Sequence, residues 1–578
     1  MAVTGTNFRL KAALRTLSKD DNKVARSMPK LQNQRGLAGI LLALLLPAIS
    51  DAQEEHHHHQ PGEKIGKVTF VVSCSTEAQR QFNRAVAWLH SFEYGESERA
   101  FNDVATTDPQ CAMAHWGAAM SLYHQLWAPP NPGELEKGAR SVQKAKQIGA
   151  KTKRERDYID AIALFFDDWE RVDHPTRAAR YEQAMEKVYV RYPGDRDAGV
   201  FYALALNATA LATVPMDKTY AKQKKAAAIL NRVLRLEPDH PGVTHYLIHS
   251  YDYPPVAHLA LAAARRYARI APSSAHALHM PSHIFTRLGL WDEDIATNIK
   301  SENAAKDYAQ RNRLKGAWDD QLHAMDYLAY AYLQQARDRE ARAVLDELKA
   351  IRKTDPETFK CAYSFAAIPA RWALERRVWS EAAELKVEPV DFPWPRFQWA
   401  EAITHFARAI GAARNGDANR ARVEVEKLAE VQRQLVGAKD NYDWATQVEI
   451  QRRAAEAWLA KAEGKNPEAL RLMRSASDLE DSTDKHPVTP GAVLPARELL
   501  GDMLLELGRP AEALKEYETS LQTSPNRFGG LYGAGRAAEL SNDRKKARGF
   551  YLKLTAMCDK ADGDRPELVH ARKFLAGN

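Results

Sequence analysis

The strongest constraint on the fold is a 34-residue repeat of small and large residues near the end of the chain. The residue pairs with this separation are Gly501 and Gly535, Ala513 and Ala547, and Tyr517 and Tyr551. Such a period is typical of a helix–turn–helix unit that stacks on its neighbours. Small residues are needed where two helices cross closely, and large residues fill the space beside them. The repeat therefore predicts stacked helix pairs.

The same register extends more loosely towards the N-terminus. From Glu77 onward, apolar residues recur every three or four positions, and no alternating β pattern of useful length occurs. Some units depart from the pattern, since Ser97 and Asp294 stand where alanine is usual. We therefore expect an all-α solenoid made of two arrays.

The expected boundary between the arrays is a short segment rich in proline and aromatic residues. Three prolines within residues 386–398 cannot lie inside a helix. We expect residues 76–385 to form a first array, this segment to be a joint, and residues 399–578 to form a second array.

Residues 1–52 have the features of a secretory signal peptide. The apolar run Leu37–Leu46 is too short to span a bilayer, which needs about 20 residues. The small residues around Ala52 predict cleavage before Gln53, and a leader of ordinary length would begin at Met28. The alternative is an uncleaved anchor. We expect an exported bacterial protein, periplasmic or secreted, with no membrane span after cleavage.

Four consecutive histidines, His56–His59, follow the expected cleavage site. Neutral imidazoles near an exposed end can bind zinc, copper or nickel. The alternative interpretation is a purification tag. In either case, we expect residues 53–75 to be a disordered, histidine-rich tail.

The chain has only four cysteines, too few for a disulfide-stabilised scaffold. Cys74 precedes the first repeat and Cys111 opens the second, and the starts of neighbouring first helices lie side by side. A disulfide between them is one prediction, and a pair of buried free thiols is the other. The formal net charge of +7 includes +5 from residues 1–52, so the remainder gives no electrostatic reason to expect nucleic acid as a partner.

The stretch Val243–Phe285 holds the most informative polar pattern. His245 and His249 are four residues apart, as are His279 and His283, and the two pairs are offset by 34 residues. Residues four apart lie on one face of a helix. If the period holds, His245 lies beside His279, and His249 beside His283, on adjacent parallel helices.

These repeats and the histidine-rich stretch resemble the tetratricopeptide (TPR) superfamily from about Glu77 to the end of the chain. The segments His245–Pro254 and Ala271–Trp291 resemble a group of exported bacterial TPR proteins. The resemblance implies a solenoid whose first helices line a concave groove that binds protein or peptide. The residues that it places in this groove are His245, His249, Asp252, His276, His279, His283, Arg287, His323 and Asp326.

Three interpretations of the histidines remain open. They are hydrogen-bonded structural residues, or a zinc or copper site formed by His245, His249, His279 and His283, or a groove that uses Arg287 to bind a carboxylate-bearing peptide. In the metal interpretation, Asp252 or Asp326 would orient a ligand. Pro281 would kink the helix that carries the second pair.

No signature of a catalytic site occurs in the sequence. We therefore expect a scaffold that binds a protein or peptide rather than an enzyme. The alternative is a metal-binding protein, or a metal-dependent enzyme, that uses the histidine cluster. An exposed cluster of this kind would titrate near pH 6, since the ordinary histidine pKa is about 6.5.

Overall fold

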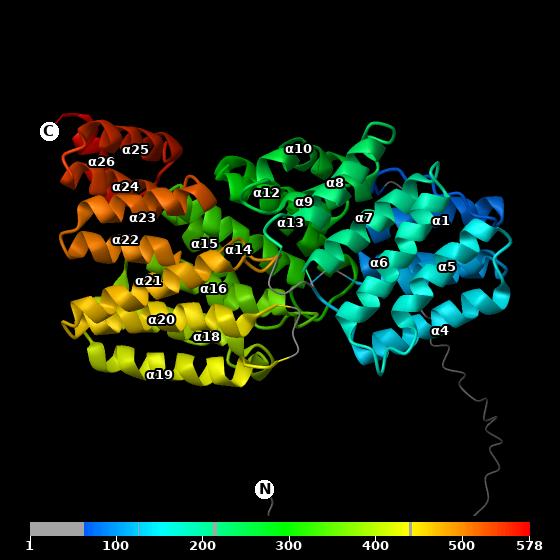
Figure 1. The fold of residues 1–578 in the computed structure, drawn as a ribbon, viewed down its shortest axis with the longest axis horizontal. Helices are drawn as coiled ribbons and strands as arrows, with labels where there is room; N and C mark the ends of the chain where they lie inside the picture. The colour runs from blue at the N-terminus through cyan, green and yellow to red at the C-terminus, as the bar shows by residue number, and fades with distance from the viewer. Residues whose placement is uncertain (1–62, 125–126, 212–216, 439–441, 578) are drawn as a thin grey trace, which may run out of the picture. The chain divides into compact units, whose positions relative to one another are not determined.

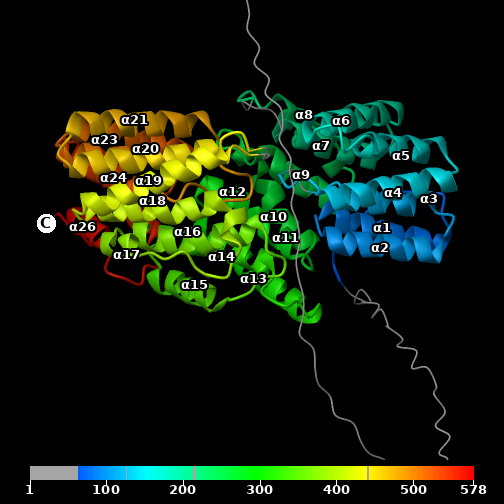
Figure 2. The ribbon, with the colours of Figure 1, turned by 90° about the horizontal axis from the view of Figure 1, so that it is seen from below.

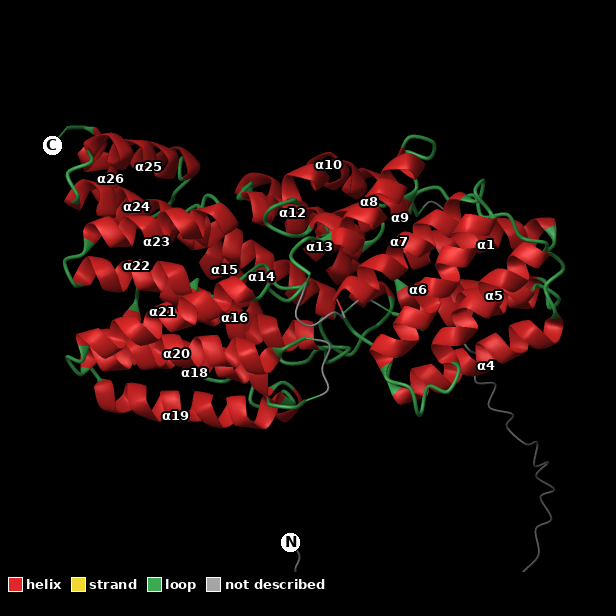
Figure 3. Ribbon diagram, viewed as in Figure 1, coloured by secondary structure: helices red, strands yellow, loops and turns green. Residues whose placement is uncertain are grey.

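The computed structural model describes residues 63–124, 127–211, 217–438 and 442–577. The predicted leader and the four histidines after it lie outside these ranges. Within these ranges every secondary-structure element is a helix, apart from one isolated β-bridge between Ala317 and Thr354 (Figure 3). The prediction of an all-α fold is confirmed. No helix in this part of the chain has the length and apolar character needed to cross a membrane.

The helices of the first half, in chain order, are α1 (Thr76–His90), α2 (Tyr94–Thr107), α3 (Ala112–Ser121), α4 (Pro132–Ile148), α5 (Lys153–Phe166), α6 (His174–Arg191), α7 (Arg196–Leu211), α8 (Ala221–Leu234), α9 (Pro241–Tyr251), η1 (Ala257–Ala260), α10 (Leu261–Ile270), α11 (Ala275–His279), α12 (Pro281–Leu288) and α13 (Trp291–Arg311). Side chains cap several of them. Asn131 and Thr152 each form a capping box with a glutamate three residues later.

The helices of the second half are α14 (Asp319–Gln334), α15 (Asp338–Ala350), α16 (Phe359–Glu375), α17 (Trp379–Ala383), η2 (Trp394–Arg396), α18 (Gln398–Arg414), α19 (Ala418–Leu435), α20 (Trp444–Ala462), α21 (Asn466–Ser482), α22 (Ala496–Glu506), α23 (Pro510–Thr523), α24 (Phe528–Leu540), α25 (Arg544–Met557) and α26 (Pro566–Leu575).

The helices pair as a TPR-like solenoid. In the second half, the first helix of a unit packs against its own second helix and against the first helix of the next unit, as α18 does with α19 and α20 (Figure 1). The same relation continues through α22, α24 and α26, and Figure 2 shows α14, α16 and α18 side by side. The 34-residue period therefore corresponds to one helix pair.

Glycine is required at the closest helix contacts of the last units. A Cβ atom on Gly501 would lie 2.7 Å from the ring of Tyr517, and one on Gly535 would lie 2.5 Å from the ring of Tyr551. Both tyrosines are completely buried. The small and large residues of the repeat are therefore direct partners.

The prediction that residues 53–75 form a disordered tail is wrong for residues 63–75. The ring of Phe70 is fully buried and packs against Phe82, Trp116 and Tyr158 at centroid distances of 5.1–5.5 Å. Val68 and Val72 are also buried, so alternate side chains of this extended segment enter the core. Residues 53–62 lie outside the described part of the chain.

A disulfide joins Cys74 to Cys111 and so connects the chain before α1 to the chain before α3. The other two cysteines, Cys361 and Cys558, are buried free thiols. Of the two predictions for Cys74 and Cys111, the disulfide is therefore the one that the structure contains.

The proline-rich segment is helix-breaking, as expected, but it does not divide the hydrophobic core. Phe392, Trp394 and Phe397 are buried in the same apolar cluster as the helices on both sides of residues 386–398. The expected joint at this position is wrong because its aromatic side chains pack on the helices of both sides: Phe392 contacts Phe365 of α16, and Phe397 contacts Trp399 of α18. The hydrophobic core divides earlier in the chain. One large cluster consists of residues up to Ala263, together with Val488, and the other consists of residues from Trp291 onward.

Candidate metal centre

The region between the two large apolar clusters contains six buried histidines in two groups of three. The first group, called trio A here, consists of His245 and His249 on α9 and His276 on α11. The Nε2 atom of His245 lies 3.1 Å from Nε2 of His249 and 3.2 Å from Nε2 of His276. Two ligands of one tetrahedral zinc ion are separated by about 3.3 Å when each bond is about 2.0–2.1 Å. Trio A therefore has the spacing of a metal site.

The second group, trio B, consists of His279 at the end of α11, His283 on α12 and His323 on α14. The Nε2 atoms of His279 and His283 are 3.1 Å apart, and the ring of His323 lies 4.0 Å from that of His279. The trios adjoin each other. The rings of His249 and His283, one from each trio, are 6.5 Å apart, close to the 6.2 Å between His283 and His323 within trio B.

The four histidines expected to converge are therefore divided between two sites. His245 is adjacent to His276, not to His279 as the 34-residue offset implied. The two helices are offset by 31 residues on both sides of Pro281, since His276 meets His245 and His283 meets Asp252. Pro281 has no N–H, so α11 ends at His279 and α12 begins at Pro281.

Hydrogen bonds at Nδ1 fix the protonation of three of the six rings. His245 Nδ1 donates to the backbone carbonyl of His90 at 2.7 Å, and a carbonyl can only accept. His279 Nδ1 donates to Oδ1 of Asn298 at 2.7 Å, and His283 Nδ1 donates to Oδ2 of Asp252 at 3.1 Å. With the proton on Nδ1, each neutral ring has a lone pair on Nε2. These acceptors correspond to the outer partners of typical histidine ligands.

The orientation of Asn298 is itself determined by its surroundings. Its Nδ2 atom donates to the backbone carbonyl of Asp294 at 2.9 Å and to Oδ1 of Asp294 at 2.6 Å. Its Oδ1 atom therefore faces His279. Sequence reasoning missed Asn298, although Asp294 gave a signal as a polar residue at a position where the repeat uses alanine.

Aromatic side chains surround trio A. The ring of Phe92 lies 4.3 Å from that of His245 and 5.6 Å from those of both His249 and His276. Tyr267 stacks on His245 at 5.1 Å. Phe92 follows the end of α1 in a left-handed conformation with φ 57°, and Glu93 N–H bonds to Trp88 O as in a Schellman turn. Sequence reasoning did not identify Phe92.

Charged groups lie outside the histidines. Asp252 Oδ2 accepts from His283 and also from Lys485 Nζ at 3.1 Å, while Asp252 Oδ1 accepts from Arg287 Nε at 2.8 Å. Burial alone would raise the pKa of Asp252, but Lys485 and Arg287 lower it well below its usual value. The carboxylate therefore stays ionised beside trio B. On another side, Lys360 pairs with Asp319 and Asp320.

Burial keeps the imidazoles neutral. It lowers the pKa of His245 to about 3 and lowers the pKa values of the other five rings of the trios. The expectation of titration near pH 6 is wrong because these side chains are buried. Burial disfavours the charged imidazolium and so lowers the histidine pKa. Neutral imidazoles are the form that binds metal.

Not every predicted residue belongs to the cluster. Asp326 pairs with the buried Arg371 and is in neither trio. Arg287 contacts Asp252 and so acts one layer further out. A separate buried group links α1, α7 and the start of α9: Asp197 Oδ1 lies 3.3 Å from His240 Nε2 and 3.7 Å from His90 Nε2.

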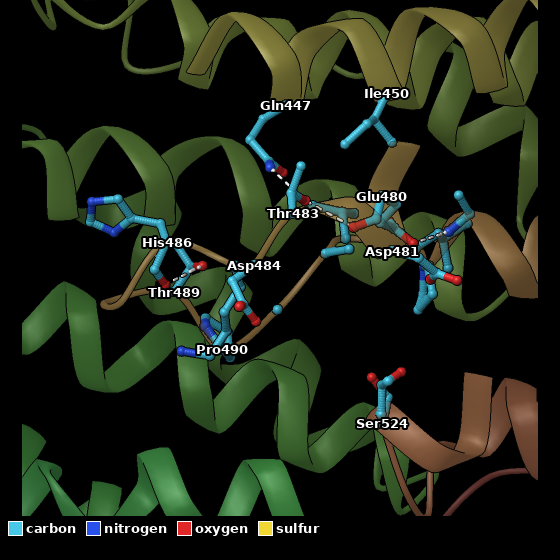
Figure 4. Close-up of a pocket in the computed structure, with 18 of the residues that line it drawn as sticks. Gln447, Ile450, Glu480, Asp481, Thr483, Asp484, His486, Thr489, Pro490 and Ser524 are labelled. Carbon is cyan, nitrogen blue, oxygen red and sulfur yellow. Dashed lines mark hydrogen bonds between the residues drawn. The ribbon is translucent and has the colours of Figure 1, made fainter. Parts of the chain in front are cut away.

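The expected open groove is not formed by these histidines, which are all buried. A cavity of about 560 Å³ lies instead mainly among the second-half helices (Figure 4), and the predicted groove residue Arg287 also lines it. Its apolar lining includes Tyr330, Tyr363, Trp399, Phe406 and Trp444. None of the six histidines of the trios lines it.

Residues 483–495, called the crossing segment here, pass from this cavity to the histidines. Tyr327 Oη donates to Val488 O at 2.9 Å, and Arg371 Nη2 donates to Gly491 O at 2.8 Å. The ring of Tyr327 also lies 4.6 Å from His279. The chain's own backbone therefore occupies carbonyl-binding positions of α14 and α16, and Lys485 reaches Asp252.

The helix pairing described above defines a TPR-like repeat protein with a buried histidine cluster. No protein-family profile matches the chain, and no curated protein matches it. Among solved structures, human IFIT1 in a dimer with m7Gppp-AAAA matches at 12% identity over 78% of this chain and 90% of that chain, with a TM-score of 0.36. The TPR domain of P58(IPK) matches at 10% identity over 87% and 99%, with a TM-score of 0.20. Similarities this low carry no argument about function.

Proposed function

We propose that the protein binds two transition-metal ions, one in each histidine trio. The observation that carries this proposal is the contact between His279 and His283. Both rings have their proton on Nδ1, so two Nε2 lone pairs face each other at 3.1 Å. Two neutral lone pairs at this distance repel each other unless a cation lies between them. A metal ion removes this conflict.

The ligand set indicates the class of metal. Imidazole is suited to zinc, copper, nickel and iron, whereas magnesium and calcium prefer oxygen ligands. Each trio supplies nitrogen only, which disfavours magnesium and calcium, and we propose zinc or copper as the ion. Three protein ligands leave a fourth position open on a tetrahedral ion, as in catalytic zinc sites. Water or a substrate atom could bind there, which a metal-dependent enzyme would require.

The test counts metal ions per chain in a background in which His56–His59 are replaced by alanine. We expect two ions in the background protein, one in either His249→Ala or His283→Ala, and none in the double variant. His258→Ala, at an exposed position outside both trios, should retain two. Elemental analysis after dialysis gives the count, and circular dichroism monitors folding.

A background protein that retains no ion would contradict the proposal. A background protein that binds one ion, and loses it in either single variant, would instead indicate one shared four-histidine site.

A second function, binding of a protein or peptide segment, is supported by the 560 Å³ cavity. Trp399 and Trp444 stack in its wall with centroids 3.7 Å apart. Such a surface suits an apolar side chain of an extended ligand. Selection from a random peptide library should enrich binders to the parent protein that Trp444→Ala loses. Undiminished binding by that variant would place the peptide elsewhere.

We also propose that the protein is exported after cleavage before Gln53. The apolar run and small-residue site of the leader support this, as does the disulfide, because disulfides persist in oxidising compartments. N-terminal sequencing of the fractionated protein tests it. An intact leader in the cytosol would contradict it.

A further inference from the structure

The charge balance around the trios distinguishes between the candidate metals. All six ligand groups are neutral imidazoles, with no carboxylate or thiolate among them. An ion bound in either trio therefore keeps its full formal charge. Any compensation must come from the surrounding side chains or from an added anion.

The carboxylates near the trios are partly neutralised by cations. Asp252 lies within ion-pair distance of two cations, Arg287 and Lys485. Lys360 pairs with both Asp319 and Asp320. The first group therefore sums to +1 and the second to −1. Lys485 and Lys360 both oppose positive charge on His279.

Two further buried carboxyl groups accept hydrogen bonds from neutral side chains, Glu93 from Ser274, and Asp294 from Thr286 and Asn298. Together the nearby groups can balance about two added positive charges, the charge of two monovalent ions and half that of two dications.

Burial makes this balance important. By Born's relation the cost of moving an ion out of water rises with the square of its charge, so a dication costs about four times as much as a monocation of similar size. Two divalent ions would add four positive charges to the region that contains His249 and His283, whose side chains are almost fully buried. Two monovalent ions would add half as many.

We propose that trios A and B are built to hold Cu(I). Imidazole nitrogen is a suitable copper ligand. Cu(I) has a filled d shell and accepts three nitrogen ligands without a fourth. The trios then need no bound anion. This inference rests on the proposed two-metal function and selects one metal for it.

The first test compares metals under anaerobic conditions in the background without His56–His59. Competition with chromogenic chelators measures the affinities for Cu(I) and Zn(II). We expect Cu(I) to bind at least 100-fold more tightly, with two ions per chain. The X-ray absorption edge of copper-loaded protein should still be that of Cu(I) after brief exposure to air.

The second test changes the charge near trio B without changing a ligand. Lys485→Met removes one positive charge that bonds to Asp252. The Coulomb energy of a lysine with a dication is twice that with a monocation, so the factor by which Zn(II) affinity rises should be the square of the factor for Cu(I). Lys218→Met is the matched control, since Lys218 is an exposed lysine that bonds to Thr483 and Asp484 on the crossing segment.

The outcomes separate the two proposals. Tighter binding of Zn(II) than of Cu(I), a Cu(II) edge, or equal responses of the two metals to Lys485→Met would overturn the assignment to Cu(I) and leave the two-metal function intact. Failure of both metals to bind would overturn both proposals.

Discussion

The Nδ1 atom of His279 and the Oδ1 atom of Asn298 form a 2.7 Å hydrogen bond between α11 and α13. This contact fixes which nitrogen of His279 is free. In known metal sites, loss of such an outer partner typically lowers metal affinity 10–100-fold.

We therefore expect Asn298→Ala to lower metal affinity at trio B about 10–100-fold while trio A is unchanged. Isothermal titration with metal should resolve a weakened and an unchanged site. Asn102→Ala, at an exposed helical position, is the control. Equal weakening of both sites would mean that Asn298 acts on folding and not on one ligand.

The metal-free protein should be sensitive to mild acid. Burial lowers the pKa of His245 to about 3, so between pH 6.5 and pH 3 the unfolded chain takes up a proton there that the folded chain does not. Stability decreases as the pH is lowered wherever the unfolded state binds more protons than the folded state. We expect this proton uptake at His245 alone to reduce the free energy of unfolding by about 2 kcal/mol between pH 6.5 and pH 5.

Urea unfolding at pH 7, 6 and 5 measures this effect, with metal-loaded protein as the comparison. A free energy of unfolding independent of pH in the metal-free protein would show that the histidines are accessible to protons when folded.

Larger side chains at the closest helix contacts should destabilise the fold. Gly501→Leu and Gly535→Leu should each lower the free energy of unfolding by about 1–3 kcal/mol, because the new side chain meets a buried tyrosine ring. Gly549→Leu is the matched control, since it is helical and a Cβ there meets nothing within 4 Å. Thermal unfolding compares the three. If all three behaved alike, the helix contacts would be misassigned.

The disulfide between Cys74 and Cys111 closes a sequence separation of 37 residues. Its removal by Cys74→Ser and Cys111→Ser should lower the free energy of unfolding by about 2–4 kcal/mol. Denaturant titration with and without a reducing agent measures the change. The reducing agent should destabilise the parent and leave the double variant unaffected. A parent indifferent to reduction would contradict the prediction.

The sequence predicted the fold well because its main signal is local. The pairing of Gly501 with Tyr517 recurs one unit later, so helix packing could be inferred from spacing alone. The buried segment around Phe70 was missed because its alternation is short and follows a polar tail. The joint at residues 386–398 was misjudged because its prolines were considered without the burial of Phe392 and Trp394.

The site was only half predictable. The four-residue spacing identified His245, His249, His279 and His283, but the helices that carry them are offset by 31 residues and not by 34. His323 joins trio B only through packing of α14. The contacts of the His90 carbonyl with His245 and of Lys485 with Asp252 join residues 155 and 233 positions apart. No local pattern encodes such pairs.

The contact between Lys485 and Asp252 also limits the modularity of the solenoid. In most repeat proteins each unit contacts only its neighbours, so terminal units can be removed with a local effect. Here the crossing segment returns from a late unit to the histidines of an early one. Truncation after α20 would therefore remove the crossing segment and expose trio B, although trio B lies in a much earlier part of the chain. High contact order of this kind also slows folding, because a long loop must close before the contact forms.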